Sequence, residues 1–257
     1  MLLAIDVGNS QIYGGVFEGG DLRATFRRTS NVRASSDEFG TFFRAVLREN
    51  GVDPAGIAAA AICSVVPDVV HSLRNAFLKY FRLEPFVLQP GVKTGLKIRY
   101  RNPLEVGADK IANAIAGVAR YPGRNLLIVD LSTATTLCAV SKDREYLGGI
   151  IAPGIHMSMA ALESNTARLP VVEIVRPPEI LGRSIIESIQ AGLYYGTLAS
   201  IRSFVEMVSM AHFTDDRPVV IGTGGFGRLF EEEHLFDAFI PELSLMGLRR
   251  AAELANK

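Results

Sequence analysis

The stretch LLAIDVGNS at residues 2–10 has a partner in LLIVDLSTA at residues 126–134. In each copy an apolar run, typical of a buried strand, ends at an aspartate, and small polar residues lead into another strand-like run. A repeat of this kind indicates a duplicated architecture. Strand-like and helical segments alternate around both copies, which predicts an α/β fold. A predicted hairpin at residues 12–17 and 22–29 adds an antiparallel edge that a plain doubly wound sheet lacks.

The chain has 257 residues, enough for two small α/β lobes, which we place at residues 1–121 and 122–257. Its 27 basic and 27 acidic residues balance, which argues against a broad nucleic-acid surface and against attraction to anionic membranes. Cys63 and Cys138 lie in apolar runs and are predicted to be buried thiols rather than a disulfide framework. The first apolar run stops at Asp6, too early for a membrane span. We therefore expect a cytoplasmic protein.

The aspartates at the two strand ends, Asp6 and Asp130, are the first candidate functional residues. A tight turn beside each could present backbone N–H groups to phosphate oxygens, while the carboxylates hold a bridging cation such as magnesium. A third turn, GTGG at residues 222–225, could border an adenosine. The alternative is ordinary strand-to-loop chemistry, for which Asp and Gly are common. The sequence contains no GxxxxGK[ST] motif, which disfavours a P-loop kinase.

The segment from Asn102 onward predicts a helix that begins at Asn102 and Pro103, because asparagine caps helices and proline suits their first turn. This assignment places Gly107 in a helix interior. The predicted apolar stripe consists of Leu104, Ala108, Ile111, Ile115 and Val118. The other, polar face consists of Glu105, Asp109 and Asn113. Periodicity alone predicts that this polar face is solvated.

Several short motifs occur together and in a fixed order. They are DVGNS at 6–10, PGVKTG at 90–95, NP at 102–103, GADKIANA at 107–114, TATT at 133–136, GG at 148–149 with PG at 153–154, and ARLP at 167–170. Together they resemble the motifs of type III pantothenate kinases, over the whole length of the chain. The series Asp-x-Gly-Asn-Ser, Asp-x-x-Thr-Ala-Thr-Thr and Thr-Gly-Gly also resembles the nucleotide motifs of the wider actin/hexokinase/Hsp70-like superfamily.

The resemblance implies two ribonuclease-H-like lobes of the actin/hexokinase-like type, with mixed sheets flanked by helices. It implies transfer of the ATP γ-phosphate to pantothenate, the first step of coenzyme A biosynthesis. Magnesium and a monovalent cation, potassium or ammonium, would be required. It also implies a homodimer with pantothenate bound near the subunit interface.

The resemblance also implies roles for individual residues. The expected ATP-binding residues are Asp6, Val7, Gly8, Asn9, Ser10, Gln11, Ile12, Tyr13 and Thr133. The expected pantothenate-binding residues are Tyr100, Gly107, Ala108, Asp109, Lys110 and Ile185. Asp109 is expected to be the general base. Asp130 would hold the monovalent cation, and Asp6 would hold magnesium directly or through water.

Three positions depart from the family pattern: Lys110 replaces the usual arginine, Ile185 the usual threonine, and Ser132 the usual glycine. A lysine cannot hold a carboxylate in the planar fork that arginine offers. An isoleucine cannot donate a hydroxyl hydrogen bond, although Ser184 next to it could compensate. A serine would strain the turn if the backbone there needs a positive φ. Two alternatives therefore stay open: a catalytically weakened relative with a binding or regulatory role, and a kinase of another small hydroxy acid.

Overall fold

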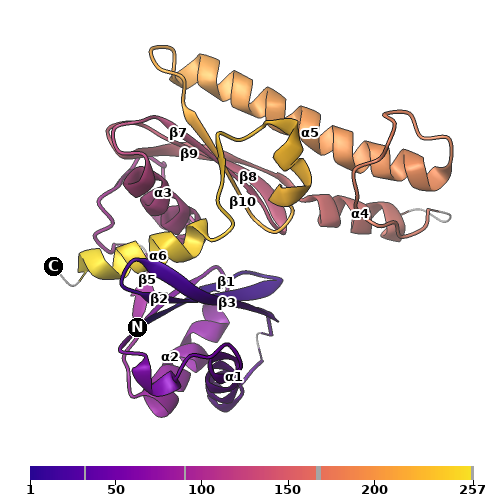
Figure 1. Cartoon of the computed structure of the whole chain (residues 1–257). Coiled ribbons are helices and arrows are strands. Elements are labelled where there is room, and N and C mark those ends of the chain that lie inside the picture. Colours follow the sequence, from indigo (N-terminus) through magenta and orange to yellow (C-terminus); the bar gives the residue numbers. More distant parts are fainter. Residues whose placement is uncertain (32, 90, 166–168, 256–257) are drawn as a thin grey trace. The chain divides into compact units, whose positions relative to one another are not determined.

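A computed structural model describes residues 1–31, 33–89, 91–165 and 169–255. Three residues of the quoted motifs, Pro90, Ala167 and Arg168, lie outside these ranges. The chain forms two compact units (Figure 1). Unit 1 comprises Met1–Leu96, Tyr100–Ala116 and Leu243–Lys257, and unit 2 comprises Lys97–Arg99 and Gly117–Glu242. The domain limits at residues 1–121 and 122–257 stay a prediction.

Unit 1 contains a five-stranded sheet in the order β3-β2-β1-β4-β5. Its strands are β1 (Leu2–Val7), β2 (Gln11–Glu18), β3 (Asp21–Thr29), β4 (Ala59–Ser64) and β5 (Phe86–Leu88). Its helical elements are α1 (Ser36–Glu49), η1 (Pro54–Gly56), α2 (Pro67–Phe81), η2 (Pro103–Glu105), the start of α3 (Ala108–Arg120) and α6 (Leu243–Ala255). Helices α1 and α2 bury Phe39, Phe43 and Phe77 beneath the sheet, while α6 packs on the opposite face against β1 and β4 (Figure 1).

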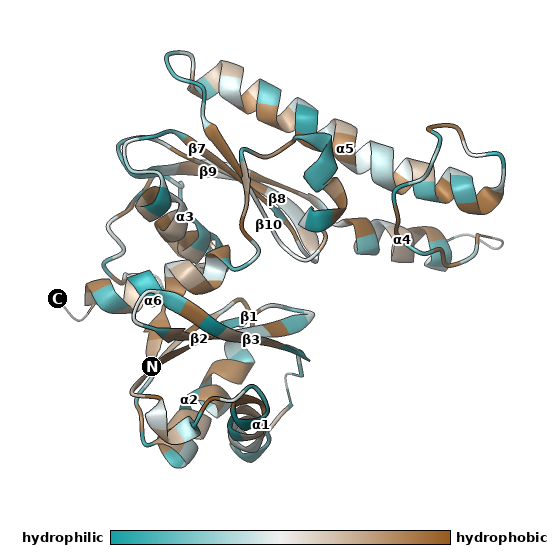
Figure 2. Ribbon diagram, viewed as in Figure 1, coloured by the Kyte–Doolittle hydropathy of each residue, from teal (hydrophilic) through white to brown (hydrophobic). Residues whose placement is uncertain are grey.

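Unit 2 contains a six-stranded sheet in the order β11-β10-β7-β8-β9-β6. Its strands are β6 (Lys97–Ile98), β7 (Leu126–Leu131), β8 (Ala134–Val140), β9 (Glu145–Pro153), β10 (Val219–Thr223) and β11 (Ala238–Phe239). Its helices are α4 (Ile155–Ser164), α5 (Ile185–His212) and η3 (Gly227–Glu233). The central strands β7 and β10 are largely hydrophobic, whereas hydrophobic and hydrophilic stretches alternate along α5 (Figure 2).

The two sheets share one topology, as the repeat predicts. In unit 1, β1 pairs antiparallel with β2 and parallel with β4. In unit 2, β7 pairs antiparallel with β8 and parallel with β10. The aspartates Asp6 and Asp130 therefore occupy equivalent places near the ends of β1 and β7. The prediction of an α/β fold with two mixed sheets flanked by helices is confirmed.

Local signals placed most elements correctly, with one important exception. The capping box at Ser35 and Glu38 is present at the start of α1. The predicted helix from Asn102 is wrong, however, because Asn102 caps only the short η2 turn, and Val106 adopts extended backbone before α3 begins at Ala108. Gly107 consequently precedes α3 rather than lying inside it.

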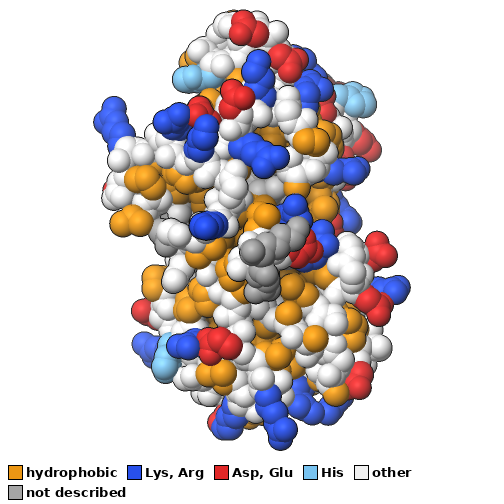
Figure 3. All heavy atoms as spheres, turned by 90° about the vertical axis from the view of Figure 1, so that its left-hand side faces the viewer, with side chains coloured by type: hydrophobic (Ala, Val, Ile, Leu, Met, Phe, Trp, Pro, Cys, Tyr) orange, Lys and Arg blue, Asp and Glu red, His pale blue; other side chains and the backbone are white. Residues whose placement is uncertain are grey.

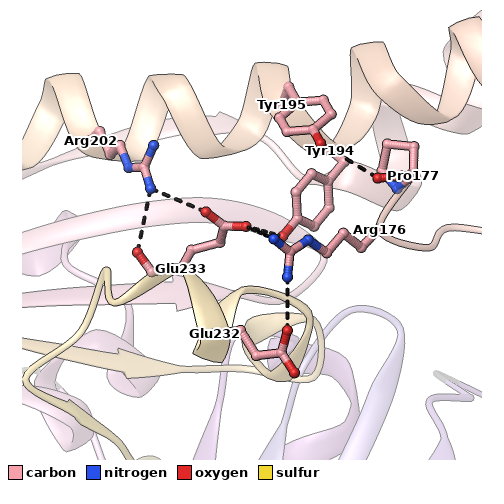
Figure 4. Close-up of polar contacts among 7 residues, drawn as sticks. All are labelled: Arg176, Pro177, Tyr194, Tyr195, Arg202, Glu232 and Glu233. Carbon is pink, nitrogen blue, oxygen red and sulfur yellow. Dashed lines mark hydrogen bonds and ion pairs between the residues drawn. The ribbon is translucent and has the colours of Figure 1, made fainter. Parts of the chain in front are cut away.

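A polar network in unit 2 connects α5, η3 and the segment before α5 (Figure 4). The Glu233 carboxylate accepts a hydrogen bond from the Tyr194 hydroxyl at 2.8 Å and contacts the guanidinium groups of Arg176 at 3.2 Å and Arg202 at 3.1 Å. Burial of the ring, and then the hydrogen bond to Glu233, raise the pKa of Tyr194 to about 12. The network thus ties η3 to the long helix.

On the face drawn in Figure 3, lysine and arginine side chains are interspersed with aspartate and glutamate side chains. This mixture accords with the 27 basic and 27 acidic residues of the sequence. No helix within the described ranges combines the length and apolarity needed to cross a membrane.

Candidate functional site

Asp6 stands near the carboxyl end of β1, directly opposite Tyr13 of β2 and Cys63 of β4. Its carboxylate accepts hydrogen bonds from two side chains. The Cys63 thiol donates to Oδ1 at 3.3 Å, and the Ser244 hydroxyl of α6 donates to Oδ2 at 2.6 Å. Asp6 is half-buried, so its carboxylate remains accessible to a ligand while it is held from within the unit.

The turn after Asp6 divides its residues between the core and the surface. Val7 and Ile12 are fully buried, so only their backbone groups could face a nucleotide. The Gly8 N–H donates to the Gln11 carbonyl at 2.9 Å and closes the turn. Asn9, like Ser10 and Gln11, is exposed. The exposed tip of the turn is therefore the part best placed to meet phosphate oxygens.

The guanidinium group of an arginine packs over the ring of Tyr13. The Arg27 guanidinium of β3 lies 3.8 Å from the ring centroid of Tyr13, its cross-strand neighbour. A cation at this distance is attracted to the face of the ring. The pair places the positive charge of Arg27 over β2, the strand that follows the turn.

Asp109 lies in the first turn of α3, where its carboxylate forms an ion pair with Lys110. The Asp109 Oδ2 to Lys110 Nζ distance is 2.8 Å, and the two side chains are only 22% and 17% exposed. The Gly107 carbonyl accepts the N–H groups of Lys110 and Ile111, so Gly107 occupies the N-cap position. A Cβ atom at Gly107 would lie 2.5 Å from Asp109 Oδ1, so any side chain there would displace the Asp109 carboxylate.

The predicted faces of this segment are wrong at two positions. Leu104, expected in the apolar stripe, is 69% exposed. Asn113, expected on the solvated face one turn after Asp109, is only 3% exposed, and its Oδ1 atom has no hydrogen-bond partner. Leu104 is exposed because it lies in the η2 turn before α3 begins, and Asn113 is buried because residues 111–117 are buried on every side of α3.

Cys63 connects Asp6 with Asp109. Burial, followed by the negative charge of Asp6 and a weaker effect of Asp109, raises the pKa of the Cys63 thiol well above its usual value. The thiol is therefore neutral and acts as a hydrogen-bond donor. Because both carboxylates influence the same buried group, Asp6 and Asp109 belong to one neighbourhood in unit 1 although 103 residues separate them (109 − 6).

Asp130 marks a second neighbourhood, in unit 2. It is 8% exposed, and it lies opposite Thr136 of β8 and beside Thr223 of β10. Directly opposite residues of an antiparallel pair project from the same face of the sheet. The Thr136 hydroxyl is buried and has no hydrogen-bond partner. The same is true of the hydroxyl of Thr135, which projects from the other face of the sheet. A carboxylate beside an unsatisfied buried hydroxyl is a fitting donor set for a hard cation.

The glycine-rich turn after β10 closes over Asp130. Gly224 has a φ of +91°, and a Cβ atom there would lie 2.5 Å from the Leu131 carbonyl oxygen and 2.6 Å from Asp130 Oδ1. The Phe226 N–H donates to the same Leu131 carbonyl at 2.9 Å. The second and third motifs of the sequence are thus parts of one site in unit 2.

Ser132 and Thr133 form the turn between β7 and β8. Ser132 is absent from the described residues with positive φ, and its N–H donates to the Ala134 carbonyl at 3.2 Å. The turn therefore does not need a positive φ at this position, and serine does not strain the backbone. Thr133 is exposed, and its carbonyl packs directly on Gly154, which leaves no room there for a side chain.

Ile185 begins α5 at the edge of an apolar groove of about 1340 Å³ in unit 2. Its side chain is 57% exposed, and the groove is otherwise lined by residues such as Met157 and Leu162 of α4. Ser184 caps α5 by accepting the Glu187 N–H at 3.2 Å. The groove contains Ile185 but none of the other predicted site residues.

Tyr100 and Ala108 are two further residues that the sequence predicts to bind pantothenate. Tyr100 is half-buried and lies in the loop after β6, which ends at Ile98. Ala108 is the first residue of α3, next to Asp109. Sequence reasoning missed Ser244, whose only signal is a small polar residue inside the buried, leucine-rich face of α6.

Known proteins resemble this chain over most or all of its length. The family model described as type III pantothenate kinase matches residues 2–207. A type III pantothenate kinase from Legionella pneumophila (strain Corby) is 52% identical over 98% of both chains. Among solved structures, a protein from Campylobacter jejuni described as a Baf family transcriptional activator aligns over 99% of this chain and 100% of its own, with 19% identity and a TM-score of 0.63.

The ethanolamine utilization protein EutJ from Carboxydothermus hydrogenoformans has the same fold at lower similarity. It aligns over 96% of this chain and 88% of its own, with 16% identity and a TM-score of 0.56. At such identities the structural matches establish the fold alone, and the relative at 52% identity establishes the family.

Proposed function

Because this chain belongs to the type III pantothenate kinase family, we propose that it transfers the γ-phosphate of ATP to the primary hydroxyl of pantothenate, forming 4′-phosphopantothenate in coenzyme A biosynthesis. The protein is accordingly a phosphotransferase. Its two cysteines are buried and form no disulfide, which agrees with the cytoplasmic location expected from the sequence.

Asp6 and the turn behind it would hold the phosphates of ATP. The magnesium ion that Asp6 would hold supplies positive charge that offsets the charge of the phosphates during transfer. Asp6 offers a carboxylate for this ion, directly or through water, and the exposed Asn9 and Ser10 offer donors to the phosphates. The support for this assignment is that the Asp6 carboxylate is half-buried and already oriented by two donors.

Asp109 would accept the proton of the pantothenate hydroxyl. The observation that supports this role most directly is the shared neighbourhood of Asp109 and Asp6, because a base must reach a hydroxyl that also reaches the γ-phosphate. Phosphoryl transfer depends mainly on positioning and charge neutralisation, so a carboxylate held in place is an adequate base. The Lys110 ammonium, 2.8 Å from Asp109, restrains that carboxylate.

Lys110 and Tyr100 are the proposed contacts of pantothenate, with Lys110 facing the substrate carboxylate. The Lys110 ammonium would attract the substrate carboxylate as a point charge rather than as a fork. Because it is ion-paired with Asp109, it would link substrate binding to the orientation of the base.

Asp130 and Thr136 would hold the monovalent cation in unit 2. A potassium or ammonium ion there would supply positive charge to this part of unit 2. The fit rests on the Asp130 carboxylate and on the buried Thr136 hydroxyl that lacks a protein partner. Thr133, on the exposed turn between β7 and β8, would contact ATP from the same side of the sheet end.

The active form would be a homodimer that covers the apolar groove beside α4 and α5. Large apolar side chains are exposed around this groove, including those of Met157, Ile185 and Ile186 at 47%, 57% and 52%. Clustered apolar exposure of this kind marks protein interaction sites. A second subunit there would bring Ile185 to an interface, where the resemblance expects pantothenate to bind.

The test is a phosphorylation assay with ATP, magnesium, potassium and pantothenate. Asp109→Asn should lower kcat at least a hundredfold, within the range that general bases contribute. Glu105→Gln is the matched control, since it removes an exposed carboxylate from the preceding η2 turn and should retain activity. Full activity in Asp109→Asn would contradict the assignment of the base. Absence of phosphopantothenate with wild-type protein, or preference for another hydroxy acid, would contradict the proposed reaction.

A further inference from the structure

Both oxygens of the Asp6 carboxylate accept hydrogen bonds from side chains that are not among the proposed ligand-binding residues. Ser244 donates to Oδ2 at 2.6 Å and Cys63 donates to Oδ1 at 3.3 Å. The Ser244 bond has the short length typical of a hydroxyl that donates to an ionised carboxylate. With one donor on each oxygen, the carboxylate cannot rotate about its Cβ–Cγ bond without losing both bonds.

Ser244 can serve as a fixed donor because α6 is locked in place. It is only 9% exposed and lies in the first turn of α6. Three residues later, Gly247 packs against the Ala112 carbonyl of α3 so closely that a Cβ atom would overlap it. Leu245, on the same helix, contacts Gly15 of β2. The same helix packs against β1, the strand that carries Asp6. The C-terminal helix thus contacts both that strand and the helix that carries Asp109.

We propose that Ser244 is a positioning residue of the reaction, which acts by orienting the Asp6 carboxylate toward the magnesium-bound phosphates of ATP. Cys63 supports the same carboxylate from the neighbouring strand as a weaker donor. This inference rests on the proposed function, in which Asp6 faces the magnesium–nucleotide complex. It adds the last helix of the chain, 238 residues from Asp6, to the machinery of the nucleotide site.

The chemistry of Cys63 agrees with a supporting rather than a reactive role. The side chain is fully buried, and burial is the main reason why the pKa of the thiol is raised. A neutral thiol donates a hydrogen bond but is a poor nucleophile. The two donors therefore differ in strength, with Ser244 as the principal one.

The experiment compares Ser244→Ala, Ser244→Thr and Ser244→Cys in the full-length protein. Two readouts are needed: steady-state kinetics with magnesium–ATP and pantothenate varied separately, and calorimetric binding of magnesium with a non-hydrolysable ATP analogue. Ser244→Ala should lower kcat/KM for magnesium–ATP about tenfold or more, the effect expected for a hydrogen bond to a charged group. The KM for pantothenate should change less than twofold. Threonine should restore the wild-type values, and cysteine should be intermediate.

Ser209→Ala is the matched control, because the Ser209 hydroxyl also donates over 2.6 Å from a helix, but to the Val205 carbonyl. It should leave both readouts unchanged. If Ser244→Ala does not fold, Ser244→Thr and Ser244→Cys still rank the donors through nucleotide affinity. Cys63→Ala should weaken nucleotide binding less than Ser244→Ala does.

The inference is overturned if Ser244→Ala binds the magnesium–nucleotide complex and turns over like the wild type, or if threonine fails to restore affinity. A larger change in the KM for pantothenate than for magnesium–ATP would also overturn it. Failure of the proposed function alone would give a different result. The wild type would bind the magnesium–nucleotide complex and Ser244→Ala would weaken that binding, but the wild type would not phosphorylate pantothenate. A wild type that does not bind the nucleotide complex at all overturns both.

Discussion

Replacement of Gly224 by alanine should damage unit 2 at the point where the glycine-rich turn closes over Asp130. Gly224 has a φ of +91°, and a non-glycine residue held in a left-handed conformation costs roughly 1–2 kcal/mol. The added Cβ would also lie 2.5 Å from the Leu131 carbonyl and 2.6 Å from Asp130 Oδ1. Overpacking of this kind costs about 1–3 kcal/mol, because backbone atoms must move. The total is about 2–5 kcal/mol.

A loss of this size is measurable, since whole domains are stable by only about 5–15 kcal/mol. We expect the thermal midpoint of Gly224→Ala to fall by about 10 °C. The half-saturating potassium concentration in the kinase assay should also rise, because Asp130 is displaced. Gly225→Ala is the matched control for stability: its φ is not positive, and nothing lies within 4 Å of the added Cβ. Equal midpoints for the two variants would refute the clash with Leu131 and Asp130.

Two further predictions concern buried hydroxyl groups of unit 2. Burial and the hydrogen bond to Glu233 raise the pKa of Tyr194 from 10.0 to about 12, so the folded state retains this proton longer than the unfolded state. Relative to Tyr194→Phe, the wild type should therefore have a pH-dependent stabilisation of at most about 2.7 kcal/mol, complete below pH 10 and lost between pH 10 and 12. Urea titrations across this range measure it, and a pH-independent difference would contradict the shift. Thr136→Val should raise the half-saturating potassium concentration at least fivefold without loss of stability, since the Thr136 hydroxyl has no protein partner. Thr135→Val, on the opposite face of the sheet, should leave the potassium requirement unchanged. Equal potassium curves for the two variants would exclude Thr136 as a ligand.

Local sequence signals predicted the elements that depend on their own residues. The runs that end at Asp6 and Asp130 became β1 and β7, because a short apolar run that ends in polar turn residues fits a buried central strand. The capping box at Ser35 formed because both of its partners lie within one turn. The matching topology of the two sheets followed from the repeat itself.

The candidate site was only partly predictable. The α3 start was misplaced because Asn102 and Pro103 are equally good signals for a short 3-10 turn, and because Val106 and Gly107 interrupt the pattern. Nothing in the sequence near residue 6 indicates that its carboxylate is held by Ser244. Periodicity describes a residue's own helix or strand and carries no information about its neighbour in another element.

The sequence by itself therefore determined the family, the duplicated α/β plan and the candidate carboxylates, because these depend on patterns within a few residues. The tertiary structure decided which groups surround those carboxylates. Strand pairing placed Cys63 beside Asp6, and packing of the C-terminal helix placed Ser244 on its other oxygen. In unit 2 the register of β7 and β10 brought the glycine-rich turn onto Asp130. Such contacts depend on which elements lie side by side, and that is settled only when the whole unit packs.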